Sequence, residues 1–129
     1  MRLRPAVIAT AVAAFLALDA VWLTLMGPRL YQPKIGHLMR PDVDWIAVLL
    51  FYAVYLAGLL GLAVSGARHA RHAALRGAFF GLVAYATYDL TNQATLRDWP
   101  WMVTGIDLVW GTFASGVAAA VAGAVAARR

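Results

Sequence analysis

The chain has 129 residues, of which 63% are hydrophobic and 13% charged, with a formal net charge of +5 and no cysteine. Soluble domains are about 45–50% apolar and about 25% charged, so this composition excludes a soluble enzyme, a disordered tail and a nucleic-acid-binding domain. The missing cysteines exclude disulfides, thiolate catalysis and metal sites built on sulfur. The length allows a single transmembrane domain over residues 1–129.

Four apolar segments predict four transmembrane helices, at residues 6–26, 45–64, 73–96 and 101–127. A helix of about 20 residues rises about 1.5 Å per residue and so crosses the roughly 30 Å hydrocarbon core. The first segment can also be read as a secretory signal peptide, but it is long for one and no small-residue cleavage pattern ends it. Gly27 and Pro28 are expected to end this first helix.

The positions of lysine and arginine indicate that both termini face the cytoplasm. That side carries seven basic residues and no acid: Arg2, Arg4, Arg68, Arg71, Arg76, Arg128 and Arg129. The outer side carries four basic residues, diluted by Asp42, Asp44 and Asp98: Arg29, Lys34, Arg40 and Arg97. The outer interface also receives Trp45, Trp99 and Trp101, since indoles prefer this depth. The predicted fold is an all-α membrane bundle of four helices with its N- and C-termini inside.

Three acids lie inside the predicted spans, namely Asp19, Asp89 and Asp107. An ionisable group in the bilayer costs several kcal/mol unless it has a partner, so each acid is a candidate functional residue. Counted from the outer ends of their helices, they lie at depths of about 10, 12 and 9 Å. The sequence therefore predicts one acidic layer in the outer half of the membrane. The basic residues of the outer side are candidates to reach inward and pair with one acid.

Further polar and aromatic side chains fall at the depth of this layer. Tyr85 and Asn92 share the helix face of Asp89 by their spacing, and the first and fourth helices each repeat an Asp-x-x-Trp pattern. Because those two helices run in opposite directions, this echo is consistent with an inverted repeat. The candidate ligand-binding residues are Asp19, Asp89, Asp107, Tyr52, Tyr85, Tyr88, Asn92, Trp22 and Trp110.

Small residues at helical spacing predict close contacts between helices. They are Gly77 and Gly81 on the third helix and Gly111, Ser115 and Ala119 on the fourth. The outer loop, residues 27–44, contains three prolines, which favour stiff turns. It is expected to cover the acidic layer from outside.

The third and fourth predicted helices carry strings that resemble a known family. Tyr88-Asp-Leu-Thr-Asn92, Trp99-Pro100 and Asp107-Leu-Val-Trp-Gly111, together with the Asp-x-x-Trp pattern of the first helix, resemble small bacterial membrane proteins of the domain of unknown function 2177. The resemblance extends over the whole chain. It implies a four-span protein of the bacterial inner membrane with no established activity. The positions that match the family motif are Tyr85, Asp89, Thr91, Asn92, Asp107 and Trp110.

Three functions remain open from the sequence. Three acids crowded in a low dielectric do not all stay ionised. The first function is therefore a binding or transport protein whose acids hold a proton, a metal cation or a cationic organic molecule. The second is a membrane enzyme, or enzyme subunit, acting on a lipid or isoprenoid. The third is an accessory subunit in which hydrogen bonds of the aspartates only fasten the helices together.

The expected partners are the lipid bilayer, a small molecule or cation and, because of the chain's small size, further copies of itself. No cofactor is expected, since the sequence shows neither a phosphate-binding loop nor a pair of metal-binding histidines within a span. His69 and His72 lie in a basic cytoplasmic stretch, which is expected to meet anionic lipid headgroups.

Overall fold

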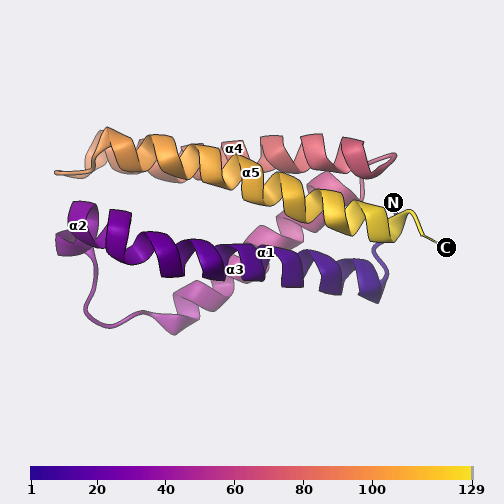
Figure 1. Cartoon of the computed structure of the whole chain (residues 1–129), viewed down its shortest axis with the longest axis horizontal. Helices are drawn as coiled ribbons and strands as arrows, with labels where there is room; N and C mark the ends of the chain where they lie inside the picture. Colours follow the sequence, from indigo (N-terminus) through magenta and orange to yellow (C-terminus); the bar gives the residue numbers. More distant parts are fainter. Residues whose placement is uncertain (129) are drawn as a thin grey trace.

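The computed structural model describes residues 1–128, and this part of the chain is helical and without strands. Four long helices run lengthwise, as Figure 1 shows. They are α1 (Pro5–Met26), α3 (Trp45–Gly58), which continues as the π-helical turn η3 (Leu59–Val64), α4 (Ala70–Thr95) and α5 (Trp101–Ala126). The predicted all-α fold is therefore confirmed for this part of the chain.

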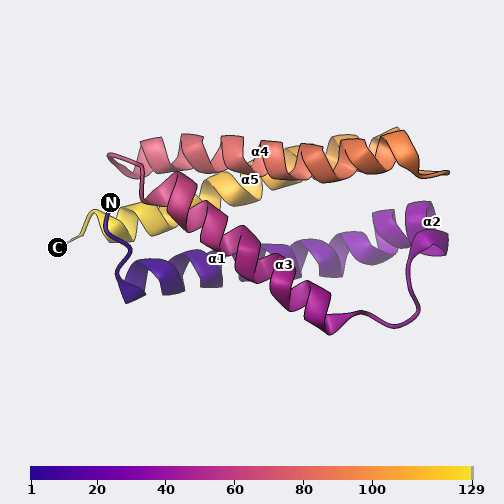
Figure 2. The ribbon, with the colours of Figure 1, turned by 180° about the vertical axis from the view of Figure 1, so that it is seen from behind.

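The four helices differ in how well they suit a membrane. Three segments are long and apolar enough to cross one: Pro5–Leu38, Trp45–Val64 and Trp101–Ala126. The 26-residue α4 is not among them, because basic residues in its first two turns and polar residues in its second half lower its hydropathy. A helix that is polar nearly all round needs protein neighbours, and α4 runs side by side with α5 in both ribbon views (Figures 1 and 2).

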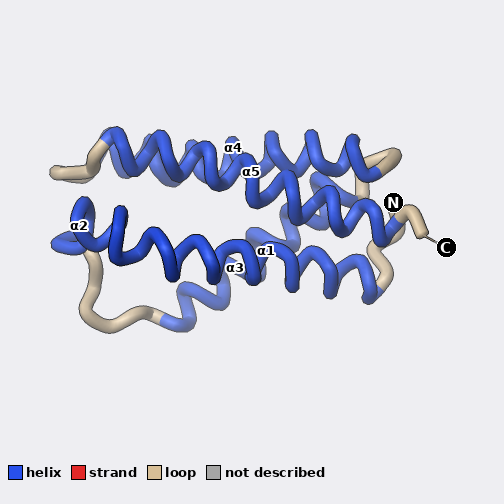
Figure 3. Tube along the Cα trace, viewed as in Figure 1, coloured by secondary structure: helices blue, strands red, loops and turns tan. Residues whose placement is uncertain are grey.

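The bundle has two different ends. Both chain termini and the loop between η3 and α4 lie at one end, which we call the terminal end. The loops before α3 and α5 lie at the opposite, distal end, as the tan segments of Figure 3 show. The halves of the bundle next to these ends are called the terminal half and the distal half.

The first helix does not end at Gly27 and Pro28, which corrects the prediction. The chain continues through a π-helical turn, η1 (Gly27–Tyr31), then α2 (Gln32–Ile35) and the short 3-10 turn η2 (Gly36–Leu38). Pro28 has no N–H to donate to the preceding turn, and the helix widens there, so that the Gln32 N–H bonds to the Gly27 carbonyl five residues back. The outer loop is thus largely helical.

The terminal half is closely packed. A Cβ atom added to Gly77 would lie 2.4 Å from the Ala119 Cβ, and one added to Gly81 would lie 2.2 Å from the Gly111 carbonyl oxygen. The predicted contacts of small residues are therefore confirmed, and they join α4 to α5 within the chain. Phe15, Leu59 and Val64 fill the remaining space of this half and are fully buried.

The distal half is more open, because α3 departs from the bundle. Figure 2 shows α3 crossing obliquely in front of the other helices, with its first half leaning away from α4 and α5. Gly58 lies close to α4 at this crossing, where an added Cβ would lie 2.8 Å from the Phe80 ring. The first half of α3 is accordingly exposed on several sides, at Trp45, Ile46, Leu49, Leu50 and Val54.

Candidate functional site

Asp107 on α5 is buried and held by a residue of the distal helical loop. The Tyr31 hydroxyl donates to Asp107 Oδ1 at 2.5 Å, and the Trp22 indole N–H donates to the Tyr31 oxygen at 2.9 Å. The extended helical path through η1 brings Tyr31 back over α5. Asp107 is therefore linked to α1 by a continuous chain of two hydrogen bonds.

Asp19 on α1 has its own tyrosine. The Tyr52 hydroxyl of α3 donates to Asp19 Oδ2, and the Tyr52 ring stands edge-on to Phe15 at 6.3 Å between centroids. This pair fastens α3 to α1 at the level where α3 begins to leave the bundle.

Asp89 on α4 differs from the other two acids. It is fully buried, and neither of its oxygens has a hydrogen-bond partner. Its polar neighbour is the carboxyl group of Asp107. Ionised carboxylates only accept hydrogen bonds, so two of them can bond to one another only if one carries a proton.

No basic side chain among residues 1–128 reaches these acids. The ion pairs of the described chain are His37 with Asp98 at 3.3 Å and Arg40 with Asp44 at 3.5 Å, both in exposed positions. The expectation that a basic residue of the distal loops pairs with a buried acid was therefore wrong for this part of the chain. The loops turn their cations toward acids of the surface, where both partners keep their hydration.

The two Asp-x-x-Trp patterns meet face to face. Trp22 and Trp110 stack with their centroids 4.3 Å apart and their planes 6° from parallel, so the two indoles lie at one depth. The helices run in opposite directions, and each acid is three residues, or about 4.5 Å, from its tryptophan. Asp19 and Asp107 are therefore offset by about 9 Å along the bundle.

The three buried acids therefore lie at two levels along the bundle, and not in the single layer that the sequence predicted. One level holds Asp19 with Tyr52, and the other, nearer the distal end, holds Asp107 with Tyr31 and Asp89. In agreement with this offset, no group of three histidine, cysteine or acidic side chains in the described chain is placed to hold a metal ion. The buried Trp110 N–H, without a partner, lies beside these levels.

The remaining predicted site residues fall in different places. Tyr85 lies between the levels: its ring covers Gly111, where an added Cβ would come within 2.2 Å of it, and stands edge-on to Tyr55. Tyr88 lies at the surface, 58% exposed and edge-on to Trp99. Asn92 is half-buried, one turn after Tyr88.

Apolar clusters close both ends of the polar levels. At the distal end Leu30 and Ile35 pack with Trp99 and Val103, as expected of a loop that covers the acids. Trp99 is buried here, whereas Trp45 and Trp101 are exposed. At the terminal end the buried core around Phe15 closes the other side.

Sequence reasoning missed Tyr31, the residue that holds Asp107. Assigning the segment after Pro28 to an irregular loop hid its place on a helix. The available signal was the spacing of Leu30, Tyr31 and Ile35, a hydrophobic helical pattern in a segment already expected to cover the acids.

Comparison with known proteins identifies the family. The model of the family described as predicted membrane protein, DUF2177, matches residues 5–124. This range includes all four long helices up to the last residues of α5, and all three buried acids. Neither the curated proteins nor the solved structures gave a match. The chain belongs to the DUF2177 family of predicted membrane proteins.

Proposed function

We propose that Asp89 and Asp107 form a proton- or cation-binding pair inside a membrane. In this proposal α4 is the fourth span, both termini face the cytoplasm of a bacterium, and the pair lies in the outer half of the inner membrane. The observation that carries the proposal is Asp89, a fully buried carboxyl group whose oxygens have no donor and whose neighbour is another carboxyl group.

The chemistry of such a pair leaves few choices. Two adjacent carboxylates in a low dielectric repel each other, and each has lost its hydration. A shared proton or a bound cation removes both costs. Divalent metal ions prefer six or more oxygen ligands in the case of Ca²⁺ and near-octahedral sites in the case of Mg²⁺, which two acids do not provide. A proton or a singly charged cation fits the pair better.

The main competing reading is that the acids only fasten helices. Asp19 and Asp107 fit that reading in part, since a tyrosine of another segment donates to each of them. Asp89 does not fit it, because it has no donor to fasten. Asp89 is therefore the residue at which binding and fastening make opposite predictions.

The test is the thermal stability of the purified protein from pH 4 to pH 9, with and without sodium, potassium or methylammonium chloride. The wild type should change its melting temperature with pH or with one cation. Asp89→Asn should stay folded, lose that response and be as stable as the wild type or more so, because an amide can donate to Asp107.

The matched control is Asp98→Asn, an exposed aspartate in the loop between α4 and α5. This variant should keep the wild-type response. If Asp89→Asn is less stable than the wild type and both proteins respond alike to pH and cations, the pair binds nothing and the proposal is wrong.

A further inference from the structure

A groove between α3 and α4 opens at the side of the bundle. It has a volume of about 770 Å³ and lies where α3 leans away from α4. Its walls are apolar, and its one hydroxyl, on Tyr55, is already engaged with Ser115. The lining residues are Ala47, Leu50, Phe51, Val54, Tyr55, Gly58, Leu62, Phe80 and Ala84.

This groove borders the tyrosines that surround the acids. Phe51 on one wall is followed by Tyr52, which holds Asp19, and Ala84 on the other wall is followed by Tyr85, one helical turn before Asp89. Tyr55 at the base of the groove stands edge-on to Tyr85 at 6.1 Å between centroids. The apolar walls and the polar levels are therefore neighbouring parts of one region.

Apolar clusters cover the approaches to the acids from both ends of the bundle. Leu30, Ile35, Trp99 and Val103 cover the distal side, and the core around Phe15 fills the terminal side. A ligand that reaches the acids in this conformation comes through the side of the bundle. In a membrane that side faces lipid, so the ligand needs an apolar part.

We propose that the site takes an amphiphile with a cationic head and a single apolar chain, which enters from the bilayer between α3 and α4. The ammonium head lies against the acids and the chain lies in the groove. This inference rests on the proposed function and names its ligand class. Charge selects the head, because the acids have no basic partner among residues 1–128 and an anionic head would be repelled.

The groove is also large enough for such a chain. Pockets of about 300–1,000 Å³ enclose most of a drug-sized ligand, and the α3–α4 groove falls within that range. A hydrated inorganic ion, in contrast, would have to give up its water before passing apolar walls whose one hydroxyl is already bonded to Ser115.

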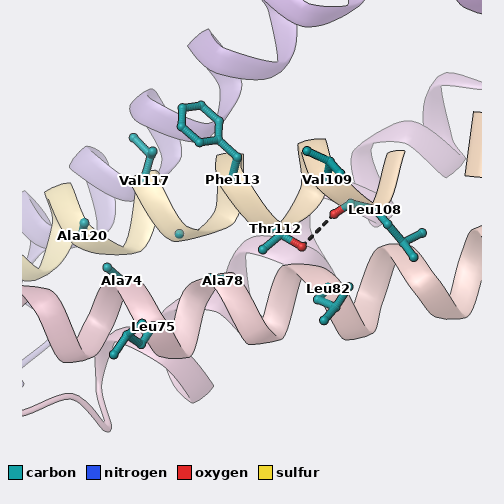
Figure 4. A pocket seen from close by; sticks show the side chains of 11 residues that line it. Ala74, Leu75, Ala78, Leu82, Leu108, Val109, Thr112, Phe113, Val117 and Ala120 are labelled. Carbon is teal, nitrogen blue, oxygen red and sulfur yellow. Dashed lines mark hydrogen bonds between the residues drawn. The ribbon is translucent and has the colours of Figure 1, made fainter. Parts of the chain in front are cut away.

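A second groove provides the internal control. Figure 4 shows it between α4 and α5, on a surface that the acids do not line; its volume is about 660 Å³. Its one hydroxyl, on Thr112, donates to the Leu108 carbonyl at 2.7 Å. It offers an apolar chain a similar surface, but Tyr55, which joins the α3–α4 groove to Tyr85 near the acids, does not line it.

The experiment measures binding of dodecylammonium to the protein in neutral nanodiscs, by native mass spectrometry and by melting temperature. Methylammonium supplies the head without the chain, and dodecanol supplies the chain without the head. Dodecylammonium should bind at least about tenfold more tightly than either, a difference of about 1.4 kcal/mol. Asp89→Asn should lower its affinity to that of dodecanol.

Two alanine variants test which groove binds the alkyl chain of dodecylammonium. Ala84→Leu adds bulk to the α3–α4 groove, and Ala120→Leu adds it to the α4–α5 groove; both alanines are half-buried. Ala84→Leu should weaken dodecylammonium binding about tenfold or more while methylammonium binding stays unchanged. Ala120→Leu should leave both unchanged, and melting temperatures without ligand verify that each variant is folded.

The outcomes separate this inference from the proposed function. If methylammonium or a proton acts on the wild type but not on Asp89→Asn, and dodecylammonium binds no better than methylammonium, the amphiphile is excluded and the carboxyl pair stands. If dodecanol binds as tightly as dodecylammonium, charge does not select the ligand and the inference is wrong. If neither cations nor pH act through Asp89, both proposals are wrong.

Discussion

The terminal and distal halves of the bundle contain the same helices but differ in how these helices pack. In the terminal half α4 and α5 approach so closely that a single added methyl group at Gly81 would collide with the backbone. In the distal half, two turns further along α4, the same helix presents Asp89, a buried acid with no hydrogen bond. Close packing in one half stabilises a fold in which the other half keeps polar groups that cost stability.

The largest expected effect is the loss of stability when a methyl group is added in the closely packed terminal half. Gly81→Ala places a Cβ about 2.2 Å from the Gly111 carbonyl oxygen and 2.5 Å from Ser115 Oγ. Because the first of these atoms belongs to the backbone, the two helices must move apart. Overpacking of this kind costs about 3 kcal/mol, which should appear as a large loss of melting temperature or as failure to purify a folded protein.

Gly105→Ala is the matched control, since Gly105 also lies on α5 within the helical bundle but has nothing within 4 Å of an added Cβ. Its stability should equal or slightly exceed that of the wild type, because alanine favours a helix more than glycine does. Equal losses in Gly81→Ala and Gly105→Ala would show that helix propensity, and not close approach, explains the small residues.

A smaller effect is expected from the polar half. Tyr31→Phe removes the donor to Asp107 and the acceptor of the Trp22 N–H. Leaving a buried polar group without its partner costs about 2 kcal/mol, so chemical unfolding should show a loss of that size. Tyr88→Phe, at an exposed position on α4, should change stability by less than half of that; a similar loss in both would mean that Tyr31 contributes no specific bond.

These two regions also differ in how far the sequence predicted them. Gly77 and Gly81 predicted the helix contact correctly, because close approach depends on side-chain size and spacing along one helix. The levels of the acids depend on two helices at once: only the stacking of Trp22 on Trp110 shows that Asp19 and Asp107 are offset. Tyr31 was missed because a proline normally ends a helix, and here the helix widens by one residue instead.

The sequence also could not predict that α3 leans away from the other helices. Its residues are apolar on all sides, and such a helix can face lipid or protein with the same composition. The close contact of Gly58 with Phe80 shows where α3 passes α4, and both residues line the groove. Composition thus predicts that a segment spans the membrane, while a few contacts decide which of its faces a ligand can reach.

The smallest expected effect concerns a histidine at the terminal end of the bundle. At the terminal end, the His72 Nδ1 accepts the Arg68 N–H at 3.1 Å, which requires an unprotonated nitrogen. Desolvation, and then the charges of Arg76 and Arg68, lower the pKa of His72 below its usual range. Since the folded pKa is the lower one, stability is full above the unfolded value of about 6.5 and falls as the pH drops below it.

Acid should therefore loosen the first turn of α4, which hydrogen exchange corrected for intrinsic rates can follow at pH 8 and pH 5. His72→Gln should remove this response. His37→Gln, a change at the distal end beside Asp98, is the matched control and should leave the response of α4 unchanged. A response that persists in His72→Gln would show that acid loosens α4 through another group.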